Sequence, residues 1–180
     1  MQSARIIAGK YKNKKLHISL LPHTRPSKAI IRESLFNTLG NAIYNKSFLE
    51  AFGGYGLVGF EALSRGAKEI FFIEKNINTF SILQKNIELF LPSLIPIFAY
   101  NEDTFLKLSN IASKIDIFYF DPPFGEAYYK NCFCILNELN LENKIVVFEH
   151  DSSFHMPQNI ATLNLNKTRK FGRSALSYYL

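Results

Sequence analysis

Residues 48–59 read Phe48-Leu49-Glu50-Ala51-Phe52-Gly53-Gly54-Tyr55-Gly56-Leu57-Val58-Gly59. The first five predict a strand, and the residues that follow the last glycine predict a helix over 60–65. Gly54, Gly56 and Gly59 have the GxGxxG spacing of a nucleotide-binding loop, in the strand–turn–helix context that such a loop requires. The segment therefore predicts an α/β fold that binds a nucleotide-containing ligand at the glycine-rich turn.

An acid after the next strand supports this interpretation. The predicted strand over residues 69–73 is followed by Glu74, which lies 18 positions after Gly56. A carboxylate in this place can accept hydrogen bonds from both ribose hydroxyls of an adenosine-containing cofactor. The alternative for Glu74 is a solvated acid at the start of a helix. NAD and S-adenosylmethionine both fit a glycine loop followed by such an acid.

Strands and helices alternate along the rest of the chain. We expect helices over residues 76–91, 104–111 and 128–139, and strands over residues 95–99, 115–120, 144–149, 160–165 and 174–179. This alternation predicts a mostly parallel sheet wrapped by helices, which binds its ligands at the carboxyl ends of the strands. Acids fall at four of these ends: Glu50, Glu74, Asp103 and Asp121. Asp103 can bond the amine of a cofactor adenine, act as the N-cap of the next helix, or do both.

The predicted strand over residues 115–120 ends in the turn Asp121-Pro122-Pro123-Phe124. An acid–Pro–Pro–aromatic turn at a strand end is typical of enzymes that methylate exocyclic amines of nucleobases. Such an amine is a weak nucleophile, but the Asp121 carboxylate and the Pro122 carbonyl can accept its hydrogens and direct its nitrogen toward a methyl group. The prolines fix φ and remove competing donors, and Phe124 offers a face for an unstacked base.

An ordinary turn is the alternative reading of these four residues taken alone. Together with the glycine loop they favour S-adenosylmethionine over NAD, because no group of residues suited to hydride transfer is evident.

Composition predicts one globular domain with a sizeable core, since the chain has 180 residues of which 47% are hydrophobic. No segment is long and apolar enough to span a membrane, and the first residues lack a signal-peptide pattern, so we expect a cytoplasmic protein. The two cysteines, Cys132 and Cys134, predict no zinc site, and we expect no metal. A monomer is the simplest expectation.

Basic residues gather at the two ends of the chain. Residues 1–32 carry a net charge of +8 and no acid, residues 33–151 carry −6, and residues 152–180 carry +4 and no acid. This distribution predicts a nucleic-acid partner, and a solvated basic arm is the alternative. We predict RNA contacts for Arg5, Lys10, Lys12, Lys14, Lys15, Arg25, Lys28, Arg32, Lys170 and Arg173.

The N-terminal segment predicts a small basic β-hairpin. Residues 5–8 and 15–19 read as short strands joined by a turn, which divides the chain into a hairpin extension over residues 1–24 and a main domain over residues 25–180.

A helix over residues 27–43 is expected to follow, with Pro26 near its first turn. One stripe of this helix is cationic at Lys28 and Arg32 and apolar at Leu35 and Leu39. The amino end of the helix therefore either overhangs the active site or the RNA, or lays its cationic side chains along the margin of the core.

The chain as a whole resembles the bacterial small-subunit (16S) ribosomal RNA guanine-N2 methyltransferases of the RsmD type. The segments that carry the resemblance are residues 5–11, 24–27, 32–37, 61–67, 121–124 and 170–172. The resemblance implies a class I S-adenosylmethionine-dependent methyltransferase, with a Rossmann-like, mostly parallel seven-stranded sheet and a small N-terminal β-hairpin extension. It implies methylation of the N2 amine of a guanine in small-subunit ribosomal RNA. The implied partner is ribosomal RNA or an assembled or assembling small subunit, and analogy with the family favours the subunit over naked RNA.

The resemblance also implies roles for individual residues. Those implied to bind the cofactor are Glu50, Phe52, Gly53, Gly54, Gly56, Glu74 and Asp103, and those implied to act on the base are Asp121, Pro122, Pro123 and Phe124. The family usually has Asp-Leu-Phe-Ala-Gly-Ser-Gly in the first loop, so Tyr55 here replaces a small residue. A Tyr55 ring turned into the site would impair cofactor binding, whereas a ring turned away would leave it unchanged.

Other functions remain as alternatives. A DNA or RNA adenine-N6 methyltransferase could use the same turn, although 180 residues leave little room for a DNA-recognition domain. A non-catalytic RNA-binding or ribosome-assembly protein on this fold is favoured by Tyr55 alone. A nicotinamide-dependent oxidoreductase explains neither the turn nor the basic ends.

Overall fold

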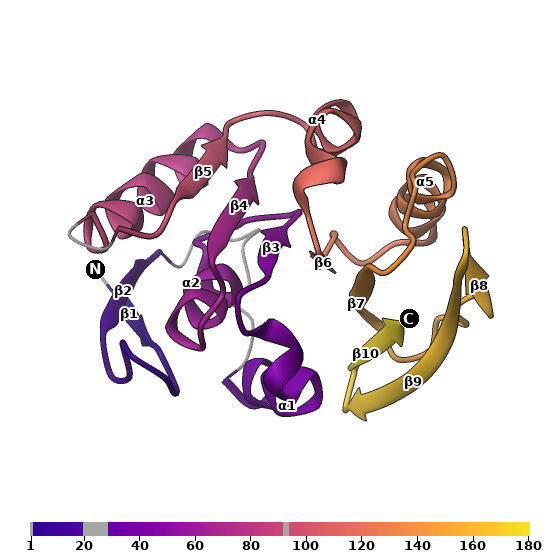
Figure 1. The fold of residues 1–180 in the computed structure, drawn as a ribbon, viewed down its shortest axis with the longest axis horizontal. Coiled ribbons are helices and arrows are strands. Elements are labelled where there is room, and N and C mark those ends of the chain that lie inside the picture. The colour runs from indigo at the N-terminus through magenta and orange to yellow at the C-terminus, as the bar shows by residue number, and fades with distance from the viewer. Residues whose placement is uncertain (1, 20–28, 92–93) are drawn as a thin grey trace.

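The computed structural model describes residues 2–19, 29–91 and 94–180 (Figure 1). Its strands are β1 (Gln2–Arg5), β2 (Lys15–Ile18), β3 (Ser47–Glu50), β4 (Glu69–Ile73), β5 (Ile97–Tyr100), β6 (Ile117–Phe120), β7 (Ile145–Asp151), β8 (Asn159–Ile160), β9 (Leu163–Phe171) and β10 (Ser174–Tyr179). Its helices are α1 (Ala29–Leu39), α2 (Leu57–Ser64), α3 (Ile77–Glu88), α4 (Thr104–Ile111) and α5 (Glu126–Asn137), with 3₁₀ turns at Gly40–Ile43 and Ala112–Lys114.

One large sheet forms the centre of the molecule, in the order β5-β4-β3-β6-β7-β10-β9-β8. The first five strands in this order are parallel, and β10, β9 and β8 continue the sheet by antiparallel pairing. The predicted mostly parallel α/β fold is confirmed. The sheet contains the seven strands expected, and the two-residue strand β8 adds an eighth at the edge.

Helices cover both faces of this sheet, as Figure 1 shows. Side chains of α1, α2 and α3 pack on one face, and side chains of α4 and α5 pack on the other. Neighbouring residues of a central strand, such as Phe118 and Tyr119 of β6, therefore belong to different cores, and both are buried. Burial on both faces explains why the parallel strands are continuous apolar runs rather than alternating ones.

The N-terminal hairpin forms a separate antiparallel sheet of β1 and β2, in which Arg5 lies opposite Lys15. It is held to the domain by two buried polar side chains. The Glu61 carboxylate of α2 accepts the backbone N–H groups of Ile7 and Ala8 at 2.8 and 3.1 Å. The Asn86 amide of α3 bonds both the N–H and the carbonyl of His17, at 2.7 and 3.0 Å.

Close approach of the hairpin turn to α2 requires a glycine. At Gly9, φ is +83°, and an added Cβ would lie 1.9 Å from the carbonyl oxygen of Ser64. The next residue, Lys10, donates its backbone N–H to the same carbonyl at 2.8 Å. A side chain at position 9 would therefore push the basic turn away from the domain.

Two predicted strands differ from the observed ones for identifiable reasons. The first strand is Gln2–Arg5 rather than residues 5–8, because Ile7 and Ala8 give their N–H groups to Glu61 instead of to a strand. The strand predicted over residues 160–165 is interrupted at Ala161, where φ is +49°, so two strands, β8 and β9, replace it. The start predicted for the first helix lies outside the described residues.

Arg32 of α1 does not reach the surface. Its side chain is buried at 4% exposure, and its guanidinium donates to the carbonyl of Arg5 at 3.0 Å. Burial lowers the pKa of Arg32, while the nearby carboxylates of Glu61 and Glu50 act in the opposite direction. This burial contradicts the RNA contact predicted for Arg32 and makes the side chain a link between α1 and the hairpin.

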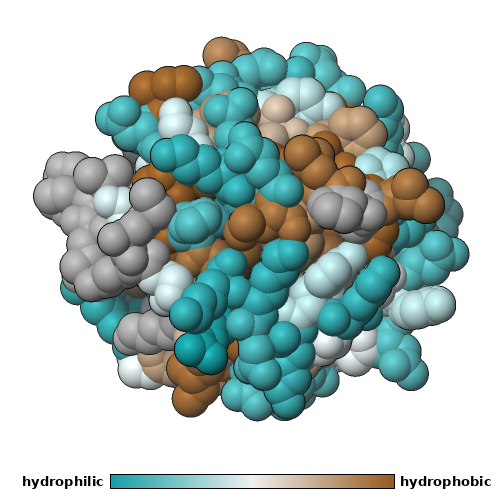
Figure 2. Space-filling view, turned by 90° about the vertical axis from the view of Figure 1, so that its left-hand side faces the viewer, coloured by the Kyte–Doolittle hydropathy of each residue, from teal (hydrophilic) through white to brown (hydrophobic). Residues whose placement is uncertain are grey.

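The side of the molecule that carries α3 is mostly hydrophilic, with apolar side chains among the polar ones (Figure 2). Ile77, Leu91, Leu94 and Phe98 are each at least 40% exposed. Within the described ranges, no helix combines the length and the apolar character that crossing a bilayer demands.

Replacing Asn86 should loosen the hairpin. Asn86→Ala removes three bonds from a fully buried side chain and leaves the polar backbone of His17 and Tyr55 without its partner. We expect a loss of about 3 kcal/mol in the free energy of unfolding, from the cost of unsatisfied buried groups. Urea denaturation measures this loss, and hydrogen exchange should show faster exchange at His17.

The exposed Asn78 on the same helix provides the matched control, since its side chain has no described contact with the hairpin. Asn78→Ala should change the stability by less than about 0.5 kcal/mol. Equal losses in the two variants would contradict the anchoring role of Asn86.

Candidate active site

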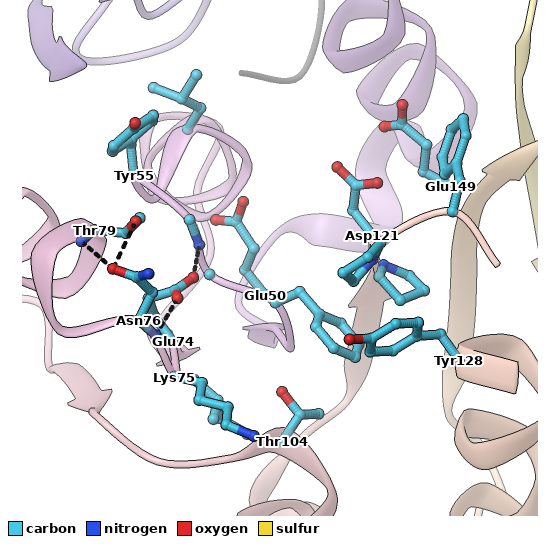
Figure 3. Close-up of a pocket in the computed structure, with 18 of the residues that line it drawn as sticks. Glu50, Tyr55, Glu74, Lys75, Asn76, Thr79, Thr104, Asp121, Tyr128 and Glu149 are labelled. Carbon is cyan, nitrogen blue, oxygen red and sulfur yellow. Dashed lines mark hydrogen bonds between the residues drawn. The ribbon is translucent and has the colours of Figure 1, made fainter. Parts of the chain in front are cut away.

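A cleft of about 940 Å³ opens where the parallel strands end (Figure 3). Residues at or just past the ends of β3, β4, β5 and β6, together with Glu149 near the end of β7, contribute to its lining, as expected for the carboxyl ends of a doubly wound sheet. Its volume lies within the range of small-molecule and cofactor sites, which is about 300–1,000 Å³.

The glycine loop forms one wall. Gly53 and Gly54 line the cleft, whereas Gly56 lies behind it at the start of α2. At Gly56, φ is +81°, and an added Cβ would lie 2.6 Å from both Leu83 and Phe60, so only glycine fits here. At Gly54 an added Cβ would meet no atom within 4 Å, which leaves the backbone of the loop open to a ligand.

Glu50 joins this loop to the end of β3. Its carboxylate accepts the backbone N–H groups of Val58 and Gly59 at 3.4 and 2.8 Å, so it caps α2 in place of Gly56, which has no side chain. Glu50 is only 5% exposed, and burial raises its pKa to about 8, although the two amide bonds act to lower it. The carboxyl group is therefore mostly protonated at neutral pH when nothing else is bound.

Glu74 shapes the opposite side of the loop. Its two carboxylate oxygens accept the N–H groups of Gly54 and Asn76 at 2.8 and 2.6 Å, and burial raises its pKa. Asn76 in turn caps α3 by accepting the N–H groups of Asn78 and Thr79. The carboxylate is thus fixed at the edge of the cleft, as Figure 3 shows.

Asp103 has the capping role that was one of its two predicted functions. Its side chain accepts the N–H of Phe105 at 2.9 Å at the start of α4, and it pairs with Lys75 at 2.7 Å. The bond from Lys75 lowers the pKa of Asp103. Because Asp103 also lines the cleft, the adenine contact predicted for it stays a prediction.

The Tyr55 ring turns toward the hairpin. It is 2% exposed, and its hydroxyl donates to the carbonyl of Ser19 at 2.7 Å. Figure 3 shows the ring pointing away from Glu74. The backbone carbonyl of Tyr55 accepts from Asn86 at 2.9 Å, so the glycine loop and the hairpin are joined through the same two side chains.

The turn after β6 faces the glycine loop across the cleft. Asp121, Pro122, Pro123 and Phe124 all line it, with Pro122 buried and Phe124 38% exposed. Tyr128, in the first turns of α5, adds a second aromatic side chain that is 43% exposed. The turn therefore places the Asp121 carboxylate in the cleft together with aromatic surfaces that a flat ring could use.

Sequence reasoning missed some residues of this cleft. Glu149 lines the cleft from within β7. The strand predicted over residues 144–149 ends at this residue, whereas the observed strand continues to Asp151. Because the carboxyl ends of neighbouring parallel strands meet, this position could have been found from the strand alone. Tyr128 could also have been found, because it is an aromatic residue close in sequence to Phe124 of the Pro-Pro turn. Among the described residues, no group of three or more His, Cys, Asp or Glu side chains could hold a metal ion.

The cationic side chains predicted to contact RNA fall into distinct groups. Arg5, Lys10, Lys12, Lys15, Lys170 and Arg173 are exposed. Arg173 also lines the cleft, where it pairs with Asp151 at 3.1 Å. Lys14 is half-buried, and its ammonium group donates to the carbonyl of Leu89, so this group is already engaged in a hydrogen bond within the protein. Arg25 and Lys28 lie outside the described residues.

The sequence matches a known family along almost its whole length. The family described as Conserved hypothetical protein 95 matches residues 4–180. The ribosomal RNA small subunit methyltransferase D of Haemophilus influenzae is 31% identical to this chain, over 91% of this chain and 88% of that protein. The protein of the same name from Buchnera aphidicola subsp. Baizongia pistaciae is also 31% identical, over 93% and 88%.

Solved structures share the fold. The Escherichia coli protein yhhF, described as a methyltransferase, has a TM-score of 0.83 at 28% identity, over 99% of this chain and 97% of that one. An RNA methyltransferase from Salinibacter ruber, in complex with S-adenosyl-L-homocysteine, has a TM-score of 0.66 at 13% identity, over 86% and 92%. The similarity thus extends over the whole domain, beyond the glycine loop.

Shortening Tyr55 should destabilise the protein. Tyr55→Phe removes the hydroxyl bond to Ser19 and should cost about 1 kcal/mol in the free energy of unfolding. Tyr55→Ser also leaves a cavity in the core and should cost about 3 kcal/mol or more. Tyr44, which is 73% exposed, is the control, and Tyr44→Ser should have a much smaller effect in the same thermal and urea denaturation series. A Tyr55→Ser variant as stable as the parent protein would contradict this role.

Proposed function

Since the chain belongs to the family described as Conserved hypothetical protein 95, the RsmD type of methyltransferase, we propose that it transfers a methyl group from S-adenosylmethionine to the N2 amine of a guanine in small-subunit (16S) ribosomal RNA. One observation carries the proposal: the glycine loop with its two acids, Glu50 and Glu74, opens into the same cleft as the Asp121-Pro122-Pro123-Phe124 turn. Cofactor site and base site are thus parts of one cavity.

The cleft fits a cationic, adenosine-containing cofactor. Gly54 leaves open space over the loop backbone, and the Glu74 carboxylate is held at the edge of the cleft, where it can accept ribose hydroxyls. Phe52 and Phe105, whose ring centroids are 6.0 Å apart, supply an apolar wall for a purine ring. Glu50, Phe52, Gly53, Gly54 and Glu74 would hold the cofactor, together with Asp103, while Gly56 shapes the loop from behind.

S-adenosylmethionine supplies an already activated methyl group, so the protein mainly has to bind and orient the two reactants. Asp121 and the Pro122 carbonyl accept the two hydrogens of the target amine, which directs its lone pair toward the methyl group. The Asp121 carboxylate also stabilises the positive charge that develops on the nitrogen. Phe124 and Tyr128 stack against the base after it leaves its own helix.

The exposed basic side chains would hold the RNA backbone. Arg173 stands at the cleft itself, while Lys10 and Lys12 lie on the hairpin extension, proposed to span residues 1–24. Contacts of this kind bind phosphates regardless of sequence and give an affinity that falls with salt concentration. An assembled or assembling small subunit is the proposed partner, because its surface offers more RNA for the basic side chains to bind than an isolated RNA hairpin does.

Activity should depend on the Asp121 carboxylate. The assay incubates the protein with radiolabelled S-adenosylmethionine and with small subunits, or their 16S RNA, from a bacterial strain that lacks its own enzyme of this type. Digestion to nucleosides and mass spectrometry identify the product, which we expect to be N2-methylguanosine. Asp121→Asn should lower turnover by about 10²–10⁴-fold, in the range found when a positioned acid or an oriented charge is removed.

Binding of S-adenosylmethionine to Asp121→Asn, measured by calorimetry, should stay close to that of the parent protein. The exposed Glu126, five residues along, gives the matched control, and Glu126→Gln should keep full turnover. Normal turnover in Asp121→Asn would contradict the role of Asp121 in holding the target amine. If the product were N6-methyladenosine, the target base would be adenine and not guanine.

Cofactor binding should release a proton from Glu50. The pKa of about 8 keeps this carboxyl group mostly protonated at pH 7, and a cation bound in the cleft favours the ionised form. We therefore expect release of between about half and one proton at pH 7, and an affinity that rises as the pH increases from 6 to 8. Calorimetry in buffers of different ionisation enthalpy measures the number of protons released.

Glu50→Gln keeps the shape of this side chain but cannot ionise. The enthalpy of S-adenosylmethionine binding to this variant should therefore depend much less on the buffer than that of the parent protein. Protons released by the cofactor itself are the same in both measurements, so the difference between the two proteins reports on Glu50. Equal proton release by the two proteins would show that Glu50 does not change its ionisation on binding, which would contradict the prediction.

A further inference from the structure

Glu149 stands next to Asp121 in the sheet. In the parallel pairing of β6 with β7, Tyr119 lies opposite Val147 and Phe120 lies opposite Phe148. The next residues are Asp121, just past the end of β6, and Glu149, within β7, and neighbouring strands are about 4.8 Å apart. Tyr119 and Val147 belong to the same core, so the residues two positions later lie toward the same face of the sheet.

The Glu149 carboxylate is held in place by the protein. It is 5% exposed, and one of its oxygens accepts the Tyr119 hydroxyl at 2.7 Å. Burial raises the pKa of Tyr119 well above its usual value, and the charges of both Glu149 and Asp121 add to the effect, so the two carboxylates are close to the same phenol. Both line the cleft, and Figure 3 shows them side by side.

We propose that Glu149 is a specificity-determining residue that accepts the N1–H of the target guanine while Asp121 holds its N2 amine. The inference rests on the proposed function and adds to it how the base is recognised. Guanine carries its N1–H next to the N2 amine, so two neighbouring acceptors match two neighbouring donors on one edge of the ring. Adenine has an unprotonated N1, whose lone pair would face the Glu149 carboxylate.

The same arrangement makes the recognition selective. A site built to bond a particular N–H rejects an analogue without it by a large factor. In such an analogue the lone pair of the ring nitrogen faces the lone pair of the acceptor, with no hydrogen between them. For Glu149 that acceptor is a carboxylate, which has no hydrogen to donate, and the bond from Tyr119 holds it in place. A purine that keeps the 2-amine but lacks the N1–H should therefore bind poorly in the orientation needed for transfer.

The test compares guanosine with 2-aminopurine riboside, which retains the 2-amine and has no hydrogen on N1. The probes are small subunits reconstituted from 16S RNA in which the methylated guanosine, once located, is either kept or replaced by splint ligation. Single-turnover rates are measured with radiolabelled S-adenosylmethionine. The parent protein should favour guanosine by at least about 100-fold.

Glu149→Gln should reduce this preference at least about 10-fold, because the glutamine amide can donate to the bare N1 while its carbonyl can still accept an N1–H. Glu138→Gln changes an exposed carboxylate at the end of α5 and should leave the preference unaltered. Calorimetry with S-adenosylmethionine checks that each variant is folded. Should Glu149→Gln fail this check, Tyr119→Phe takes its place, since it frees the carboxylate and should also lower the preference.

An unchanged preference in a folded Glu149→Gln variant, or in Tyr119→Phe where that replaces it, would overturn the inference. So would a parent protein that methylates both bases equally well. These results differ from failure of the proposed function, in which the parent protein would form no N2-methylguanosine on unaltered subunits.

Discussion

The Glu50 carboxyl group accepts hydrogen bonds from the first turn of α2, and these bonds fix the geometry on which the site depends. A helix that starts at a glycine loop cannot have an N-cap side chain, because at Gly56 a Cβ would collide with Leu83 and Phe60. The capping acceptor has to come from elsewhere, and the end of β3 is the nearest place. The same carboxyl group thereby stabilises the helix and presents an ionisable function to the cleft.

The glycine loop is also tied to the N-terminal hairpin. Asn86 bonds the backbone of both His17 and Tyr55, and the Tyr55 hydroxyl reaches the end of the hairpin at Ser19. Glu61 holds the hairpin turn from the other side. Cofactor loop and basic hairpin are thus positioned by shared buried hydrogen bonds, which keeps the proposed RNA surface in a fixed relation to the site of transfer.

The parallel part of the fold could be predicted from the sequence because its strands are buried on both faces and appear as uninterrupted apolar runs. The strand over residues 69–73 and the helix over residues 104–111 have the predicted bounds. Prediction failed where a distant partner decides the outcome. Ile7 and Ala8 resemble a strand, but their N–H groups meet the carboxylate of Glu61, 54 and 53 positions away.

The prediction for Arg32 failed for a related reason. Its charge suggested a surface position, but the carbonyl of Arg5 and the nearby Glu61 carboxylate make its burial tolerable. Most of the residues predicted for the cleft do line it, because they follow strand ends and strand ends converge. Gly56 is the exception, since the tight turn that requires a glycine also turns it away from the ligand. The direction of the Tyr55 ring could not be predicted, because it depends on the carbonyl of Ser19, which follows β2 and lies 36 positions away.

The charges of the cleft and of its surroundings have opposite signs, and this contrast decides what can enter. Among the described lining residues, the acids are Glu50, Glu74, Asp103, Asp121 and Glu149, and the cations are Lys75 and Arg173. A phosphate inside such a cleft would meet more acidic than cationic side chains, whereas the exposed lysines and arginines of the two chain ends would attract it. The RNA backbone is therefore expected to stay outside while an uncharged base enters with its N–H groups toward the carboxylates. A cationic methyl donor is stabilised by the acids that exclude phosphate, so one charge pattern separates the three chemical groups that the reaction brings together.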